Sequence, residues 1–290
     1  MSVDKKLVLI QTPKGEPRFL GAGHIARPVI QRSFADSDPF LLLMDDFLDK
    51  QDDEPVGGPH PHAGFETVSL LLEGEVGDEA HVMKGGDLQL MTAGRGVVHT
   101  ETIAKKAKMR LLQLWLNLPK KDRNATPRVQ DIALANVPFS DSDGVSIRLY
   151  SGSLAGLTSP VLNYTPLIIA DLNLEAGVST TLELPASYNG FIYVIDGAVL
   201  VGKDAQMLDH DQVGWLNHVE SKEISKLELT AGTAGVRFIL YAGEPQGDPV
   251  VSQGPFIADS SEDIRRLYQE YRQGKMQHIS QAKDEQRIKW

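Results

Sequence analysis

Two pairs of side chains that are able to bind a metal ion stand close together in the first half of the chain. His60 and His62 are separated by one residue, and the same spacing separates His99 from Glu101. In an extended strand, residues i and i+2 point to the same face and lie about 6.6 Å apart along the chain. Two neighbouring strands that carry these pairs would therefore direct three imidazoles and one carboxylate toward a single divalent ion.

The surroundings of the two pairs favour a metal site over a polar turn. Glycine-rich turns flank both pairs, and two matching pairs are rarely a coincidence. Three neutral imidazoles and one carboxylate leave two positions open on a six-coordinate ion, an arrangement that Fe²⁺, Mn²⁺, Co²⁺ and Ni²⁺ accept more readily than Zn²⁺. The remaining histidines are isolated in the sequence, and we expect ordinary structural or surface roles for His24, His81, His210, His218 and His278.

The composition of the chain limits its classes of function. Its 290 residues suggest two domains, which we place at residues 1–135 and 136–290. The formal net charge of −10 argues against direct nucleic-acid binding. Cysteine is absent, so a metal ion must rest on nitrogen and oxygen ligands. We find no targeting or membrane-spanning pattern in the sequence and expect a cytoplasmic protein.

Short apolar runs separated by Gly, Pro, Asn and Asp predict a chain of many short strands. Residues 39–44 form an apolar run that we expect to end at Asp45 and Asp46, and residues 67–72 form another. The clearest alternation of apolar and polar side chains is at residues 110–118, where the leucines fall on one predicted face. The pattern as a whole predicts an all-β scaffold.

The second half of the chain repeats the pattern of the first. Residues 191–197 resemble residues 68–74, because each is an apolar strand that ends in an acidic residue and a glycine. No His-x-His pair follows residue 101, and the second copy is expected to lack a metal site. One helix is predicted between residues 259 and 274, and the polar tail after it is expected to be loosely held.

Several stretches resemble the signature of one known family. They are residues 60–68, 72–74 and 86–101, followed by residues 113–119 and 249–256. The run MTAGRGVVHTE, from Met91 to Glu101, is the most specific of them. Together they resemble the pirins, two-domain members of the cupin superfamily, and the resemblance extends over nearly the whole chain.

The resemblance implies two antiparallel double-stranded β-helix (cupin) barrels in tandem, with a short C-terminal helix. It implies one ion per chain in the N-terminal barrel, mononuclear Fe(II), with Mn, Co, Ni or Cu as alternatives. The implied ligands are His60, His62, His99 and Glu101. The pocket or the support of these ligands is expected to include Phe65, Glu66, Met91, Gln113 and Trp115.

The resemblance also implies an activity. In a quercetin 2,3-dioxygenase-like reaction, O₂ opens the ring of a flavonol-like aromatic substrate and carbon monoxide leaves, while Glu101 accepts the proton of the substrate's hydroxyl group. Ala63 stands where the family more often has Arg, and Leu90 stands where Trp is common. The hairpin at residues 75–85 is shorter than is usual for pirins. These departures lie beside the site or at the mouth of the pocket, so they bear on which substrate the chain accepts.

Two other functions remain open. The first is a metal- or redox-sensing regulator that binds a protein partner, which the anionic composition fits better than contact with DNA. The second is a cupin isomerase or metal-dependent hydrolase acting on a sugar or a small acid. Beyond Lys84 and Arg95, however, no cluster of basic residues near the predicted ligand strands would hold a phosphate.

Overall fold

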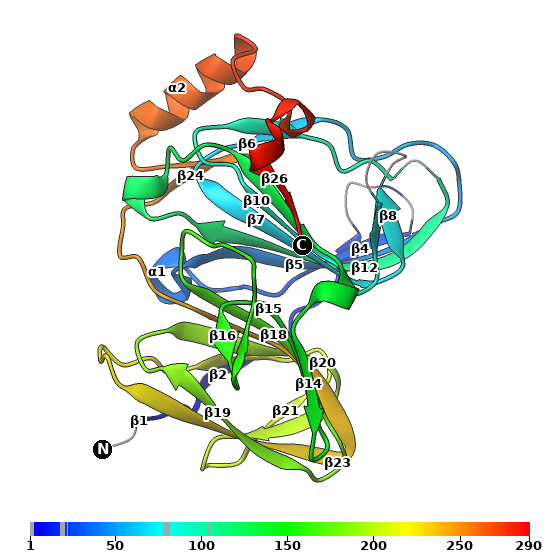
Figure 1. The fold of residues 1–290 in the computed structure, drawn as a ribbon, viewed down its shortest axis with the longest axis vertical. Helices are drawn as coiled ribbons and strands as arrows, with labels where there is room; N and C mark the ends of the chain where they lie inside the picture. Colours follow the sequence, from blue (N-terminus) through cyan, green and yellow to red (C-terminus); the bar gives the residue numbers. More distant parts are fainter. Residues whose placement is uncertain (1–2, 18–20, 22, 78–81, 104) are drawn as a thin grey trace. The chain divides into compact units, whose positions relative to one another are not determined.

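The computed structural model describes residues 3–17, 21, 23–77, 82–103 and 105–290. These residues form mainly antiparallel β-strands, and the longer of the two α-helices found among them lies near the C-terminal end (Figure 1). The predicted all-β class with a short C-terminal helix is confirmed. In the part of the chain that the structure describes, no helix has the length and apolar character needed to cross a membrane.

Contacts divide the chain into two compact units. The N-terminal barrel consists of Lys14–Ile30, Phe40–Asn136 and Gln246–Trp290, and the C-terminal barrel of Met1–Pro13, Gln31–Pro39 and Val137–Pro245. Each unit therefore takes in one end of the chain from the opposite half. This differs from the contiguous domains predicted at residues 1–135 and 136–290, because β2 (Leu7–Gln11) pairs within the C-terminal barrel and β26 (Arg287–Lys289) within the N-terminal one.

The N-terminal barrel is built on an eight-stranded sheet with the order β26-β13-β10-β7-β12-β5-β4-β3. Its strands are β3 (Glu16–Pro17), β4 (His24–Pro28), β5 (Phe40–Lys50), β7 (Phe65–Glu73), β10 (Leu88–Thr92), β12 (Ala107–Asn117), β13 (Arg128–Ile132) and β26 (Arg287–Lys289). Three strand pairs lie outside this sheet, namely β6 (His60–His62) with β11 (Val97–His99), β8 (Glu75–Gly77) with β9 (Val82–Lys84), and β24 (Val251–Gln253) with β25 (Phe256–Ala258). The tip of the predicted short hairpin, residues 78–81, lies outside the described residues. The helical elements are α2 (Ser261–Arg272), η1 (Lys120–Asp122), η2 (Leu134–Asn136), η3 (Ile279–Gln281) and η4 (Asp284–Gln286).

Strand β12 shows how the sequence pattern sets the two faces of this sheet. Leu112, Leu114 and Leu116 are at most 1% exposed and lie on one face, as the alternation predicts. Each such leucine contributes about 1.5–3 kcal/mol through removal of apolar surface from water. Gln113 and Trp115 lie on the opposite face, which is only half-buried. That face is therefore the one available to a functional site.

Strand β5 is longer than predicted, because it continues through Asp45 and Asp46 to Lys50. Both carboxylates have partners on neighbouring strands. Arg110 of β12 donates two hydrogen bonds to Asp45, at 3.0 and 2.8 Å, and Asp46 is 2.9 Å from Nε2 of His24. These partners accommodate the two acidic residues within the sheet. The prediction that the strand ends at Asp45 and Asp46 is therefore wrong.

The C-terminal barrel is built on a ten-stranded sheet whose main order is β14-β15-β18-β23-β20-β22-β2. Its strands are β1 (Val3–Asp4), β2 (Leu7–Gln11), β14 (Phe139–Ser142), β15 (Val145–Ser151), β18 (Leu167–Leu174), β19 (Ser179–Pro185), β20 (Asn189–Val201), β21 (Gln206–Asp209), β22 (Val213–Leu216) and β23 (Ile224–Gly243). The same unit holds α1 (Phe34–Ser37) and the small pair of β16 (Ser153–Leu154) with β17 (Leu157–Thr158). Its core is a large cluster of buried aliphatic side chains that also includes Phe238.

Strand β20 also runs past its predicted end. The acidic residue and glycine expected to stop it, Asp196 and Gly197, lie within the strand. Register shifts against β23 occur on both sides of this dipeptide, and bulges of this kind let a strand bend and continue. Gly197 has a φ of +74°, which favours glycine at the bend.

A buried lysine ties the start of the chain to two loops of the C-terminal barrel. The ammonium group of Lys5 donates to the carbonyl oxygens of Ala186, Tyr188 and Asn217, at 3.0, 2.9 and 2.8 Å. Burial lowers its pKa from 10.5 to about 8. At pH 7 the group therefore remains charged, with three acceptors around it.

We expect Lys5→Met to lower the free energy of unfolding by about 2–4 kcal/mol, because one buried and two part-buried carbonyl groups lose their donor. The measurement is urea denaturation at pH 7. The control is Lys6→Met, because Lys6 is exposed, and this change should alter stability by less than about 0.5 kcal/mol. Equal stability of the two variants would mean that the three carbonyls do not depend on the ammonium group.

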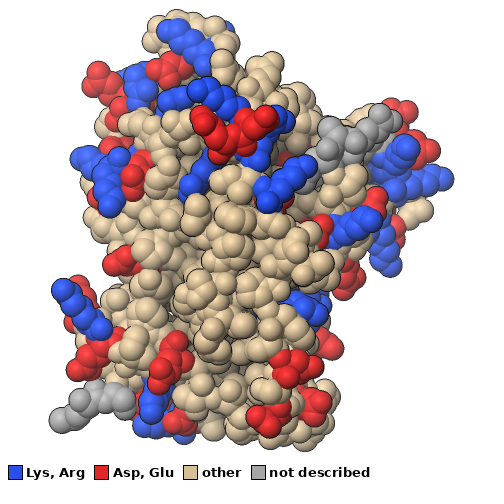
Figure 2. Space-filling model, viewed as in Figure 1, with Lys and Arg blue, Asp and Glu red and all other residues tan. Residues whose placement is uncertain are grey.

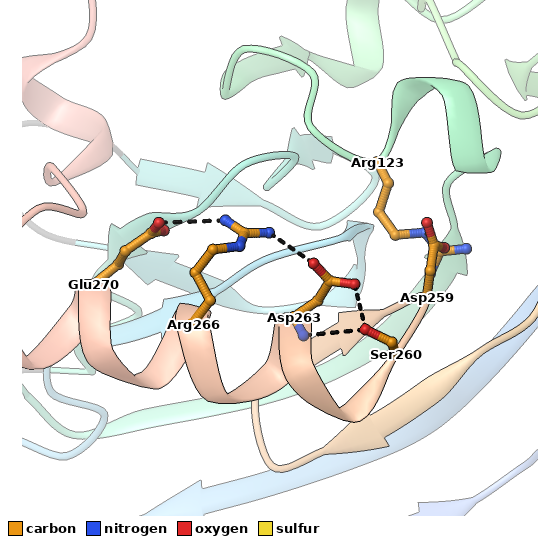
Figure 3. Close-up of polar contacts among 6 residues, drawn as sticks. All are labelled: Arg123, Asp259, Ser260, Asp263, Arg266 and Glu270. Atoms are coloured by element: carbon orange, nitrogen blue, oxygen red, sulfur yellow. Dashed lines mark hydrogen bonds and ion pairs between the residues drawn. The ribbon is translucent and has the colours of Figure 1, made fainter.

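The predicted C-terminal helix is present as α2. Its N-cap residue, Ser260, accepts a hydrogen bond from the backbone N–H of Asp263 at 3.2 Å (Figure 3). Ile264 and Leu267 are buried beneath it. The tail that follows is not loosely held as predicted, because its last strand, β26, pairs in parallel with β13.

Candidate metal centre

The two predicted ligand pairs lie on neighbouring strands. β6 and β11 form a two-stranded antiparallel sheet in which His60 lies opposite His99, Pro61 opposite Val98 and His62 opposite Val97. His60 and His62 share one face of β6 because they are two residues apart. The register therefore brings three imidazoles to the same side of this small sheet.

The three histidines converge closely enough to share one ion. Each offers a ring nitrogen, and these atoms all lie within 4.8 Å of one another. Nε2 of His60 is 2.8 Å from Nε2 of His99, close to the separation of two neighbouring ligands that each lie about 2.1 Å from an ion. His62 and His99 are only 5% and 3% exposed, whereas His60 is half-buried.

Two glycines allow the chain to pass close to these strands. Gly64 has a φ of +86°, and a Cβ placed there would lie 1.9 Å from the carbonyl oxygen of Ile257. Gly57 has a φ of +80°, and a Cβ there would lie 2.2 Å from the carbonyl oxygen of Glu101. Neither position accepts a side chain without movement of the backbone, which explains the glycines that flank the first pair.

The surroundings keep the buried imidazoles neutral. Burial, followed by the charge of His60, lowers the pKa of His62 from 6.5 to about 3, and the carbonyl of Pro255 acts weakly in the opposite direction. Burial also places the pKa of His99 well below its usual range, with smaller contributions from His62, His60 and His278. Neutral rings present a lone pair, which is the form that binds a metal ion.

The proton of the third ring is placed by a hydrogen bond. Nδ1 of His60 lies 2.9 Å from the carbonyl oxygen of Gly58, which can only accept, so Nδ1 carries the proton. Nε2 of the neutral ring is then unprotonated and faces His99. Fixing a ligand's tautomer in this way is typical of metal sites. The donor set therefore fits a divalent ion bound through nitrogen.

Glu101 lies at the edge of this group. Its Oε2 is 3.9 Å from Nε2 of His60, and 40% of its side chain is exposed. Desolvation raises the pKa of its carboxyl group, the charge of Asp46 adds to this effect, and His60 opposes it. The carboxylate is not part of the three-histidine cluster within 4.8 Å. Its place as a fourth ligand stays a prediction.

Two aromatic residues predicted for the pocket contact the histidines. The rings of Phe65 and Trp115 each have their centroids 5.2 Å from that of His62, and 4.4 Å from each other. Met91 and Trp115 both lie opposite Thr67, so they share one face of the sheet. Thr67 is two residues after Phe65 on β7, so Met91 and Trp115 lie on the same face of the sheet as Phe65, and this face is the one toward the histidines.

The other two predicted pocket residues, Gln113 and Glu66, lie on opposite faces of the sheet. Gln113 lies opposite Ser69, on the face of Phe65, and accepts a hydrogen bond from the Ser69 hydroxyl at 3.1 Å. Glu66 lies on the opposite face, fully buried, and accepts a hydrogen bond from the hydroxyl of Thr92 at 2.6 Å. Glu66 is four residues after His62, a spacing that would put it on the ligand face of an uninterrupted strand. The turn at Gly64 shifts the phase and places Glu66 on the other face.

Two isolated histidines have partners that the sequence does not indicate. His24 pairs with Asp46, and His278 lies 2.9 Å from the hydroxyl of Thr100, between the predicted ligands His99 and Glu101. Thr100 and His278 are 178 residues apart, so no local pattern reveals their contact. His81 lies outside the described residues.

One further His-x-Glu spacing occurs in the C-terminal barrel. His218 and Glu220 lie after β22 rather than on a strand, and both are exposed. Residues i and i+2 share a face only within a strand, so this spacing does not bring the two side chains together.

Comparison with known families matches both halves of the chain. The family model described as "Pirin" matches residues 25–116, and the model described as "Pirin C-terminal cupin domain" matches residues 169–277. Together these matches take in the ligand strands β6 and β11 and most of the second barrel.

Individual relatives agree with these matches. Pirin from Homo sapiens is 33% identical over 286 residues, covering 95% of each chain, and a pirin-like protein from Solanum lycopersicum is 35% identical, covering 88% of each. Among solved structures, quercetin 2,3-dioxygenase from Acinetobacter baumannii is 26% identical with a TM-score of 0.80, covering 96% of this chain and 100% of that one.

Proposed function

This chain belongs to the pirin family, and we propose that its N-terminal barrel is a mononuclear metal site at which O₂ opens the ring of a flavonol-like aromatic substrate. The observation that carries the proposal is the convergence of three imidazoles whose ring nitrogens lie within 4.8 Å of one another. The structural relative described as a quercetin 2,3-dioxygenase supports the choice of reaction.

In the proposed site, His60, His62 and His99 hold the ion, and Glu101 is the fourth ligand. Fe(II) is the proposed metal, with Mn, Co, Ni or Cu as alternatives that the nitrogen and oxygen donors also accept. A bound ion would supply Lewis acidity and a meeting point for the substrate's oxygen and O₂.

The protein's own groups would position the substrate and receive its proton. Glu101 lies at the edge of the histidine cluster, 3.9 Å from Nε2 of His60, where its carboxylate would accept the hydroxyl proton of a flavonol. The half-buried ring of Trp115 lies beside His62, with the buried ring of Phe65 packed against both, and such an aromatic wall suits a flat aromatic molecule. Both atoms of O₂ enter the product, and one ring carbon leaves as carbon monoxide.

The test is oxygen consumption by anaerobically iron-loaded protein with a panel of flavonols. We expect one O₂ consumed and one carbon monoxide released per flavonol, and a loss of roughly 100-fold or more in kcat for Glu101→Gln, which cannot accept the proton. The metal-free protein is the control. Absence of oxygen uptake across the panel, with one iron bound per chain, would contradict the dioxygenase.

The second candidate is a metal- or redox-sensing regulator that binds a protein partner. The net charge of −10 fits this better than contact with DNA, and on the face shown in Figure 2 basic and acidic side chains lie close together. A partner captured stoichiometrically in one redox state of the metal, without flavonol turnover, would favour it. Turnover that needs no oxygen would instead favour the isomerase or hydrolase.

A further inference from the structure

The C-terminal arm, residues 251–281, contacts both strands of the candidate metal centre. At β6, the backbone N–H of Ile257 donates to the carbonyl of Ala63 at 2.9 Å, next to His62. The N–H of Ala63 in turn donates to the carbonyl of Pro255 at 3.4 Å. The arm therefore pairs with the chain directly after the first two histidines.

The same arm contacts the second ligand strand. The N–H of Val98, next to His99, donates to the carbonyl of Gln277 at 3.0 Å. Nε2 of His278 lies 2.9 Å from the hydroxyl oxygen of Thr100. The arm thus reaches the backbone on one side of His99 and the side chain on the other.

The proton on His278 is assigned by its other neighbour. Nδ1 accepts from the backbone N–H of Ser280 at 3.2 Å and lies 2.7 Å from the Ser280 hydroxyl, which is able to donate to it as well. A backbone N–H only donates, so in the neutral ring Nδ1 carries no proton. Nε2–H must then donate to the oxygen of Thr100. This donation fixes the side chain that lies between His99 and Glu101.

Apolar packing holds the arm in place. Ala63 is packed in one buried cluster with five side chains of the arm, and Val98 packs against the same cluster. The members from the arm are Phe256, Ala258, Ile264, Leu267 and Met276. Met276 also lies over Gly96, where a Cβ would come within 2.8 Å of its methyl carbon.

The two ligand strands need such support. β6 and β11 pair with each other in a sheet of only two short strands, separate from the eight-stranded sheet. An isolated two-stranded hairpin is marginally stable in water. Among the described residues, the arm adds a parallel bridge to each side, Ala63 with Phe256 and Val98 with His278.

We propose that the C-terminal arm is a latch for the metal centre, with His278 as its positioning residue: arm docking aligns the ligand strands, and metal binding holds the arm docked. The proposal rests on the proposed metal site. Coupling between two binding events is reciprocal, so whatever the docked arm adds to metal affinity, the metal adds to arm docking.

The first experiment titrates the purified full-length protein with Ni²⁺, which is stable in air, against a competing chelator. We expect His278→Ala to weaken Ni²⁺ binding roughly 10- to 100-fold, as for other residues that orient metal ligands. His278→Gln, which keeps a donor toward Thr100, should recover most of the affinity. Lys275→Ala, an exposed change on the same arm, should leave it unaltered.

The second experiment measures amide hydrogen exchange with and without Ni²⁺. In the wild type, Ni²⁺ should slow exchange at Ile257 and Val98, whose N–H groups join the arm to the ligand strands. In His278→Ala, the factor by which saturating Ni²⁺ slows exchange at these two amides should fall by as much as the Ni²⁺ affinity falls. If that variant does not fold, Thr100→Val removes the acceptor from the other side and should give the same two results.

The outcomes separate the latch from the metal site itself. Wild-type protein that binds Ni²⁺, together with His278→Ala or Thr100→Val of unchanged affinity, would overturn the latch and leave the metal site standing. Wild-type protein that binds no metal would overturn both. Weaker binding with matched loss of amide protection, restored by His278→Gln, supports the latch.

Discussion

Replacing His99 with alanine should abolish metal binding while leaving the N-terminal barrel folded. His99 is 3% exposed, and its Nε2 lies 2.8 Å from that of His60, so its removal takes away a central donor. The loss of affinity should exceed the 10- to 100-fold that is typical of residues which only support a ligand. Metal analysis after anaerobic iron loading, with calorimetric titration, gives the measurement.

The control for this variant is His210→Ala, because His210 is an exposed histidine of the other barrel, with 56% of its side chain accessible. It should retain one ion per chain. The unfolding free energy of metal-free His99→Ala should change by only about 1–2 kcal/mol. One tightly bound iron in His99→Ala would contradict the three-histidine site.

The largest effect on stability is expected for Arg110→Met. Arg110 makes two hydrogen bonds to Asp45, whose side chain has no exposure, and it stacks over the ring of Phe47 at 4.6 Å from the centroid. The variant leaves the buried carboxylate of Asp45 with the more distant Arg27, at 3.4 Å, in an ion pair. Breaking a buried ion pair in this way costs about 3–5 kcal/mol, measured by urea denaturation.

An exposed arginine in two ion pairs is the matched control for Arg110. Arg266 of α2 lies 3.3 Å from both Asp263 and Glu270, with 46% of its side chain exposed (Figure 3). Arg266→Met should cost less than about 1 kcal/mol, because water screens these pairs. The double variant Asp45→Leu/Arg110→Met should recover part of the lost stability. Similar losses for both single arginine variants would argue against a special role of burial.

Much of the fold could be predicted because strand patterns are local. The leucines of β12 and the capped helix α2 follow from spacing alone. The length of β5 could not be predicted, because the carboxylate of Asp45 is held in the sheet by Arg110, which is 65 residues away. A carboxylate next to an apolar run signals a strand end unless its partner is known.

In the candidate site, too, features set by local spacing could be predicted, whereas features set by turns or long-range contacts could not. His60 and His62 could be predicted to share a face because nothing interrupts the strand between them. Glu66 could not, because the turn at Gly64 changes the phase before β7 begins. The contact of His278 with Thr100 depends on how the whole chain folds back on itself, and sequence spacing carries no information about it.

The exchange of chain ends between the barrels affects the order in which a growing chain is able to fold. Synthesis proceeds from the N-terminus, and domains generally fold as they emerge from the ribosome. All segments of the C-terminal barrel have been made by residue 245, whereas the N-terminal barrel needs residues 246–290. The barrel encoded first is therefore completed last. In a nascent chain, the segment that packs against the ligand strands is made only after every segment of the C-terminal barrel has been made.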